Sequence, residues 1–450
     1  MFNKHIKDFN ESIIGLREFV DFIDPYLNDK AKEHDKHISP LIVFGLIKNF
    51  ISKKNDWQDN EKEELEKLKA EANAEILEVY KREIDFEVKI EDQVDEKSKV
   101  VKIVYKPIDN IELRDHIDNA NKVRNHINLL YKNSLISLLS SVEWFFSQIL
   151  HYYYDKHPES AGIQKKTMTL SDLKGFGTIE DAEKYLIDVK IEEILRGNFE
   201  SWISVLKSEL SLGLGYIEPI KEELIEIYQR RNLFVHNGGV VNSIYLSKVK
   251  EQYRKDIKAN QQLAVEKEYL EDAICKLQRA FILIASELWK NLDKTDKTRG
   301  DVLTDIVYEN LLKNRWDICE GLTFFIINDS QLDITDKVVS QLNYWLCKKR
   351  TNQYESIKKE LEKADYSDKK EIFQLALFSL KDDKESFFRM LPSALDSRQL
   401  NIERLEEFPI FKEMRESEEY QKFKEESKYF KEPNQEIERT YSTEEQDGNI

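Results

Sequence analysis

Tyr228-Gln-Arg-Arg-Asn-Leu-Phe-Val-His-Asn-Gly-Gly239 is the stretch that decides how the chain is interpreted. It extends a pattern of apolar residues at helical spacing, namely Ile217, Ile220, Leu224, Ile227 and Tyr228. The pattern predicts a helix with one buried face, and that face continues through Arg231 to Val235. An unpaired buried charge is costly, so we expect Arg231 to meet a carboxylate, a ligand anion or a cleft formed with another chain.

His236 follows Arg231 with four residues between them, and Asn237-Gly238-Gly239 comes directly after it. Asn and Gly commonly end a helix, so the sequence places a titratable imidazole at the C-terminus of the helix that carries Arg231. Cleavage of a phosphodiester needs at least a cation that binds the phosphate and a group that transfers a proton, and Arg231 and His236 are residues of these two kinds.

The composition favours a mainly α fold. Of 450 residues, 34% are charged, whereas there are only 13 glycines and 8 prolines, a balance typical of long helices. The length allows two or three domains. The three isolated cysteines predict neither a disulfide scaffold nor a zinc ribbon, and favour a reducing cytoplasm; they are Cys275, Cys319 and Cys347.

Neither a signal peptide nor a membrane span is predicted. The first residues are amphipathic and include carboxylates, and no apolar run approaches the roughly 18–20 residues that a span requires. We therefore expect a soluble cytoplasmic protein with no membrane partner.

The net charge of -17 argues against indiscriminate binding to nucleic acid. From Lys221 to Lys255, however, seven Lys and Arg residues face four Glu residues, a local excess of three positive charges. Two interpretations remain open for this excess: a focused site for one nucleic-acid strand, or a solvated face.

Four regions are predicted along the chain. Residues 1–112 form a helical segment that includes a charged helix over 61–82 and a β-hairpin of Phe86–Ile90 with Val100–Tyr105. Residues 113–296 form a helical bundle, in which apolar stripes run over 135–153 and 270–288. Residues 300–426 form helical repeats, and residues 427–450 a disordered acidic tail.

A 34-residue spacing relates Leu312, Leu346 and Leu380 in the third region. This period resembles that of the tetratricopeptide class and implies an α-solenoid of helix pairs. The small residues of that class are poorly matched, so unrelated helices in a chance leucine register remain the alternative.

The segments RRNLFVHNGGVVNSIYL, SLLSSVEWFFSQIL and SDLKGFGTIEDAEKYL resemble a bacterial branch of the HEPN superfamily (higher eukaryotes and prokaryotes nucleotide-binding). The domains of this family are all-helical and carry Arg-polar-x3-to-x5-His at the end of a late bundle helix. The resemblance covers about residues 120–295.

The resemblance implies an RNA-cleaving site without metal or cofactor, assembled from two copies of the motif across a homodimer interface. Arg231 would bind the scissile phosphate, His236 would act as general base or acid, and Asn232 would orient the histidine or a phosphate oxygen. Glu143 is the expected acidic partner of Arg231; a surface position or a core ion pair is the alternative for it. Further candidates are Arg230, Asn237, Asn242 and Tyr245, of which Asn242 and Tyr245 would either contact a nucleotide or seal the bundle.

The function expected from this resemblance is a metal-independent endoribonuclease that cleaves by 2′-hydroxyl transesterification, acting as a regulated toxin in bacterial antiphage defence. The N- or C-terminal regions would bind a regulatory protein partner. The alternative is a non-catalytic dimerisation or nucleotide-binding module with a peptide-binding scaffold of helical repeats.

Overall fold

The computed structural model describes residues 2–52, 86–92, 99–105, 110–254 and 256–430, and Lys67, Ala70 and Ala74 singly. Almost all of the charged helix predicted over 61–82 lies outside the described residues, as does the tail from residue 431 onward. The chain divides into two compact units, Met1–Leu288 and Trp289–Ile450. The domain boundaries predicted at 112 and 296 do not coincide with this division.

The described part of the chain is mainly helical, which confirms the predicted fold class at that level. Where the sequence predicts a hairpin, β1 (Phe86–Asp92) and β2 (Lys99–Tyr105) pair antiparallel, with Val88 opposite Ile103. No helix among the described residues combines the length and the apolar character that crossing a membrane would require.

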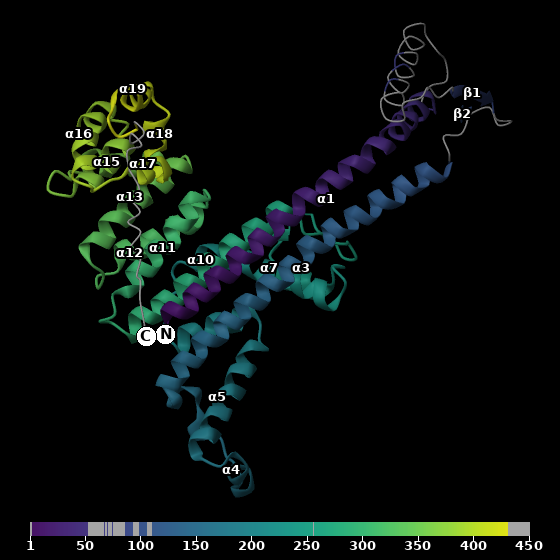
Figure 1. Cartoon of the computed structure of the whole chain (residues 1–450). Coiled ribbons are helices and arrows are strands. Elements are labelled where there is room, and N and C mark those ends of the chain that lie inside the picture. Colours follow the sequence, from purple (N-terminus) through teal and green to yellow (C-terminus); the bar gives the residue numbers. More distant parts are fainter. Residues whose placement is uncertain are drawn as a thin grey trace, which may run out of the picture. The chain divides into compact units, whose positions relative to one another are not determined.

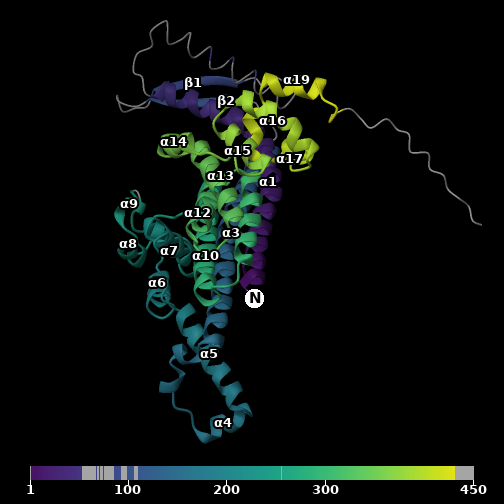
Figure 2. The ribbon, with the colours of Figure 1, turned by 90° about the vertical axis from the view of Figure 1, so that its left-hand side faces the viewer.

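Two long helices, α1 (Phe2–Ser52) and α3 (Asn110–Lys156), lie side by side in the first unit (Figures 1 and 2). The buried apolar residues of α1 recur at helical spacing, and the Phe9 ring stacks on that of Phe145 with 4.2 Å between centroids. Polar contacts join α1 to α10 (Lys267–Leu292), because Lys267 pairs with Asp24 at 2.8 Å. The helical part of the predicted N-terminal segment therefore belongs to the same unit as α3.

The remaining helices of the first unit are shorter. They are α4 (Leu170–Phe176), α5 (Ile179–Leu195), α6 (Phe199–Ser208), α7 (Lys221–His236), α8 (Ser243–Lys248) and α9 (Glu251–Arg254), with 3-10 turns η1 (Pro158–Ala161), η2 (Ile163–Lys165) and η3 (Glu218–Ile220).

An aromatic cluster forms the core where α3, α6, α7 and α10 meet. The Trp202 ring of α6 lies 4.7 Å from Phe146 of α3 and 5.4 Å from Tyr228 of α7, measured between centroids. Phe281 of α10 makes an edge contact with Phe146 at 6.0 Å. Large buried rings contribute strongly to core stability, so this cluster fixes α7 against the rest of the unit.

The second unit is a series of helices, several of which pack on a neighbour in the sequence or on the next helix but one. They are α11 (Thr298–Leu312), α12 (Trp316–Asn328), α13 (Ile334–Arg350), α14 (Tyr354–Lys363), α15 (Glu371–Leu380), α16 (Lys384–Asp396), α17 (Ile402–Glu407), the 3-10 turn η4 (Pro409–Phe411), α18 (Lys412–Arg415) and α19 (Glu418–Glu426).

The three leucines of the proposed 34-residue period lie on alternate helices, α11, α13 and α15. Leu346 and Leu380 are buried, whereas Leu312, the last residue of α11, is only half-buried. The assignment to a tetratricopeptide-like solenoid stays a prediction.

Ser427–Phe430, where the sequence predicts the first residues of a disordered tail, instead pack against helices of the second unit. Tyr429 donates hydrogen bonds from its hydroxyl to the carbonyl of Pro392 at 3.1 Å and to Asp396 Oδ1 at 2.7 Å. The ring of Phe430 packs near those of Tyr420 and Phe423. Aromatic residues within an otherwise polar stretch thus hold Ser427–Phe430 against α16 and α19.

Candidate active site on helix α7

The apolar stripe predicted upstream of Arg231 is confirmed, since all five of its residues are buried: Ile217, Ile220, Leu224, Ile227 and Tyr228. The extension of that stripe to Val235 is wrong, because the Val235 side chain is 46% exposed. Helix α7 ends one residue later, and the chain after it folds back over Leu233, whose carbonyl accepts hydrogen bonds from the amides of Asn237 and Gly239. The last turn is therefore covered on the Leu233 side only.

The predicted partnership of Arg231 with Glu143 is present. Nη2 of Arg231 donates a 2.8 Å hydrogen bond to Oε1 of Glu143 on α3, and Nη1 donates to Oδ1 of Asn232 at 3.2 Å. The side chain of Arg231 is 17% exposed and that of Glu143 is 31% exposed. The guanidinium on the apolar face is thus compensated by a carboxylate, as the cost of burying a charge requires.

Buried polar groups surround this ion pair. Nε of Arg231 and the hydroxyl of Tyr228 are enclosed and have no hydrogen-bond partner in the described structure. Burial raises the pKa of Glu143, and the charge and hydrogen bond of Arg231 oppose that shift. Burial also raises the pKa of Tyr228, the charge of Glu143 adds to the effect, and Arg231 opposes it. The three residues therefore form one electrostatic group between α3 and α7.

Arg231 keeps donors for a further anion. A guanidinium has five N–H donors; the contacts to Glu143 and Asn232 engage two of them and Nε–H is enclosed, which leaves one donor on each of Nη1 and Nη2. Its planar fork matches the oxygens of a phosphate. An incoming phosphate group would meet a guanidinium that is already oriented by its carboxylate partner.

His236 lies at the exposed end of α7 and forms no hydrogen bond within the described part of the chain. It lies five positions after Arg231 at about 100° per position, so the two side chains leave the helix about 140° apart. The single chain consequently does not join Arg231 and His236 through any hydrogen bond.

Two glycines shape the chain directly after His236. Gly238 and Gly239 have φ of 60° and 87°, in the left-handed region that suits glycine. A Cβ on Gly239 would lie 2.8 Å from Cε1 of Phe234 and 2.6 Å from Nε2 of Gln262. Asn237 closes the turn, because its Nδ2 donates to the carbonyl of Val240 at 2.5 Å.

Two further candidates, Arg230 and Tyr245, belong to a buried network centred on Glu226. Oε1 of Glu226 accepts hydrogen bonds from Nε of Arg230 and from the hydroxyl of Tyr245, both at 2.7 Å. Oε2 accepts from the hydroxyl of Tyr269 at 2.6 Å, and the Arg230 guanidinium lies 4.1 Å from the centroid of the Tyr269 ring. Of the two roles considered for Tyr245, the structure places it in the sealing position, since it is 1% exposed.

Asn242 occupies the N-cap of α8, where Oδ1 accepts a 2.9 Å hydrogen bond from the amide of Tyr245. Capping of this kind is a common role for Asn. The residues missed from the sequence are Glu226 and Tyr269. The spacing of Glu226 four positions before Arg230 was the available signal, because such a pair meets on one helix face.

Among the described residues, no three His, Cys, Asp or Glu side chains gather in a way that could hold a metal ion. Comparisons of the chain with protein-family models, with curated proteins and with solved structures found no match.

Proposed function

We propose that the protein is a metal-independent endoribonuclease of the HEPN type, active as a homodimer in which two copies of α7 face one another. The observation that carries the proposal is the half-buried, carboxylate-oriented guanidinium of Arg231 on the same short helix as the exposed imidazole of His236, which has no hydrogen-bond partner among the described residues. In the proposed site, Arg231 would bind the anion and His236 would contact the same bound molecule.

A second copy of the chain would bring its own Arg231 and His236 to the site, which in one chain point in different directions. An exposed apolar side chain adjoins the site: Val235, next to His236, is 46% exposed. Exposed apolar residues around a functional group are typical of an interaction surface. In a two-fold arrangement, residues of one surface meet the same surface of the partner, so two Arg231 and two His236 side chains would converge.

The proposed reaction is transesterification. One imidazole accepts the proton of a ribose 2′-hydroxyl while the 2′-oxygen attacks phosphorus. The bond from phosphorus to the 5′-oxygen breaks, and the second imidazole, in its protonated form, donates a proton to that oxygen. Arg231 stabilises the charge that develops on the phosphate oxygens, and Asn232 holds the guanidinium through its 3.2 Å contact. The products are a 2′,3′-cyclic phosphate and a free 5′-hydroxyl.

The test is incubation of the full-length protein with total RNA in EDTA, with the termini of any fragments identified. Wild type should cleave, and Arg231→Ala and His236→Ala should each lose at least about 100-fold in rate. Arg196→Ala and His126→Ala are matched controls, because both side chains are exposed and lie away from α7. Identical RNA patterns from wild type, both site variants and both controls would rule the activity out. We extend the proposal to a regulated toxin in bacterial antiphage defence on the family resemblance alone.

A further inference from the structure

The second unit contains a groove of about 760 Å³ that is separate from the site on α7. Its walls come from α11, α13, α15 and α17 together with the chain that follows α17 into η4. The floor is apolar and includes Leu311, Leu342, Phe373, Phe408 and Phe411. A hollow of this size and lining can enclose several apolar side chains of a bound molecule.

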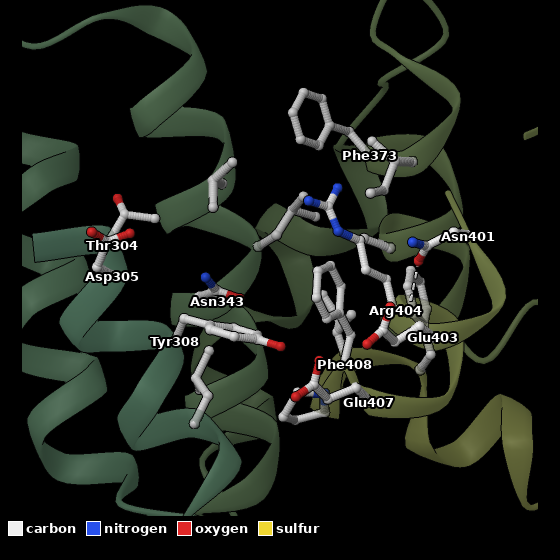
Figure 3. Close-up of a pocket in the computed structure, with 18 residues that line it drawn as sticks. Thr304, Asp305, Tyr308, Asn343, Phe373, Asn401, Glu403, Arg404, Glu407 and Phe408 are labelled. Atoms are coloured by element: carbon white, nitrogen blue, oxygen red, sulfur yellow. Dashed lines mark hydrogen bonds between the residues drawn. The ribbon is translucent and has the colours of Figure 1, made fainter. Parts of the chain in front are cut away.

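The charges of the groove lie at its edges. Figure 3 shows Asp305 on one side of the groove and Glu403 with Arg404 on the opposite side, while Tyr308, Phe408 and Glu407 lie between them. Among the lining residues, carboxylates therefore outnumber guanidinium groups.

The internal contacts of the groove stiffen its middle. The ring of Tyr308 packs edge-on against Phe408 with 5.4 Å between centroids. Burial and the hydrogen bond with Glu407 raise the pKa of Tyr308 to about 12, so its hydroxyl remains a donor to that carboxylate. Side chains fixed in this way are available for binding without first being ordered.

We infer that this groove binds an amphipathic helical segment of another protein, with apolar side chains on the floor and Lys or Arg side chains at the carboxylates of Asp305, Glu403 and Glu407. The spread of the carboxylates over two opposite edges favours an elongated occupant, because a small molecule would need polar groups that converge on one place. The negative charge at the edges of the groove favours a basic occupant.

The chain's own C-terminal residues do not have the complementary charge. Residues 431–450 contain six Asp and Glu residues against two Lys and Arg residues. A segment with this excess of negative charge would be repelled by the acidic edges of the groove, which excludes this tail as the favoured occupant.

The experiment uses the full-length protein and a fluorescent peptide that carries Leu and Phe at helical spacing between lysines. A second peptide has glutamate in place of every lysine. Fluorescence anisotropy should show saturable binding of the lysine peptide, with binding of the glutamate peptide at least about tenfold weaker. Equal affinity for the two peptides, or no saturation with the lysine peptide, would overturn the inference.

A pair of isosteric double variants locates the binding. Glu403→Gln with Glu407→Gln should weaken the lysine peptide about 5- to 20-fold, because two edge charges are lost while an amide oxygen can still accept from Tyr308. Glu385→Gln with Glu418→Gln removes the same charge from exposed positions outside the groove and should leave the affinity unchanged. Equal affinities for the two double variants would show that the peptide binds elsewhere and would refute the inference.

Discussion

Oε1 of Glu143 on α3 accepts a 2.8 Å hydrogen bond from Nη2 of Arg231 on α7, across 88 positions of sequence. The contact joins the long helix of the first unit to the helix that carries the Arg-x4-His motif. It both compensates a guanidinium on an apolar face and sets the direction in which that guanidinium points.

Replacing Glu143 should lower the free energy of unfolding. Breaking a fully buried pair costs about 3–5 kcal/mol, and the partial exposure of Glu143 and Arg231 reduces the expected loss for Glu143→Ala to about 1–2 kcal/mol. Denaturant unfolding followed by circular dichroism measures it. Glu192→Ala is the control, since its pair with Arg196 is mostly exposed. Equal stability of the Glu143 and Glu192 variants would show that the Glu143 pair contributes little.

Gly239 should tolerate no side chain. Its φ of 87° disfavours L-residues, and a Cβ would lie within 3 Å of the Phe234 ring. We expect Gly239→Ala to destabilise the chain by about 2–4 kcal/mol. Gly238→Ala is the comparison, because its φ is also positive but no atom lies within 4 Å of its Cβ position, and about 1 kcal/mol is expected there. Thermal unfolding of the two variants separates the effect of crowding from that of the backbone; equal melting temperatures would contradict the crowding argument.

The second unit should lose stability in acid through Asp329. Burial by itself raises the pKa of Asp329, but hydrogen bonds from Arg299 and from the amide of Gln331 overcome it and hold the pKa below the ordinary 3.8. The resulting stabilisation is present above pH 3.8 and is lost as the pH falls through the lower, folded-state value.

The check on this prediction is unfolding of wild type and Asp329→Asn between pH 7 and pH 2. The advantage of wild type over the variant should shrink as the medium becomes more acidic. Asp368→Asn, at an exposed position, should show no such dependence. A constant difference between wild type and Asp329→Asn at every pH would contradict the assignment.

A charge at Val235 should prevent self-association if the α7 surface is the dimer interface. Val235→Glu introduces like charges that meet across a two-fold axis, so the dissociation constant should rise at least about tenfold and RNA cleavage should fall with it. Ile179→Glu is a matched control, because Ile179 is a 69% exposed apolar residue on α5. Sedimentation velocity over a range of concentrations gives the result. A Val235→Glu protein that associates like the control would place the interface elsewhere.

Helical periodicity predicted the buried face of α7 correctly from Ile217 to Tyr228, because side chains that recur at helical spacing must share one environment. The same logic failed at Val235, since periodicity gives the phase of a residue but not where the neighbouring helices stop. Glu143 was also predicted as the partner of Arg231, because a guanidinium on an apolar face requires a carboxylate and Glu143 lies in the helix that carries the apolar stripe over 135–153.

The network around Glu226 was not found from sequence. Its donors lie on α7, α8 and α10, and no local spacing connects Tyr245 with Tyr269. The charges at the edges of the groove in the second unit were missed for a similar reason. Asp305 and Glu403 are far apart in the chain, and they line the same groove only in the folded unit. Contacts of this kind depend on tertiary geometry.

The carboxylate of Glu226 on α7 accepts hydrogen bonds from Tyr245 of α8 and Tyr269 of α10, which opposes rotation of α7 about its own axis. Arg231 and His236 consequently keep their directions on the surface, and a rotation of α7 is not expected to change them. Under the proposed function, a regulator would therefore act by bringing a second surface opposite α7 or by withholding it.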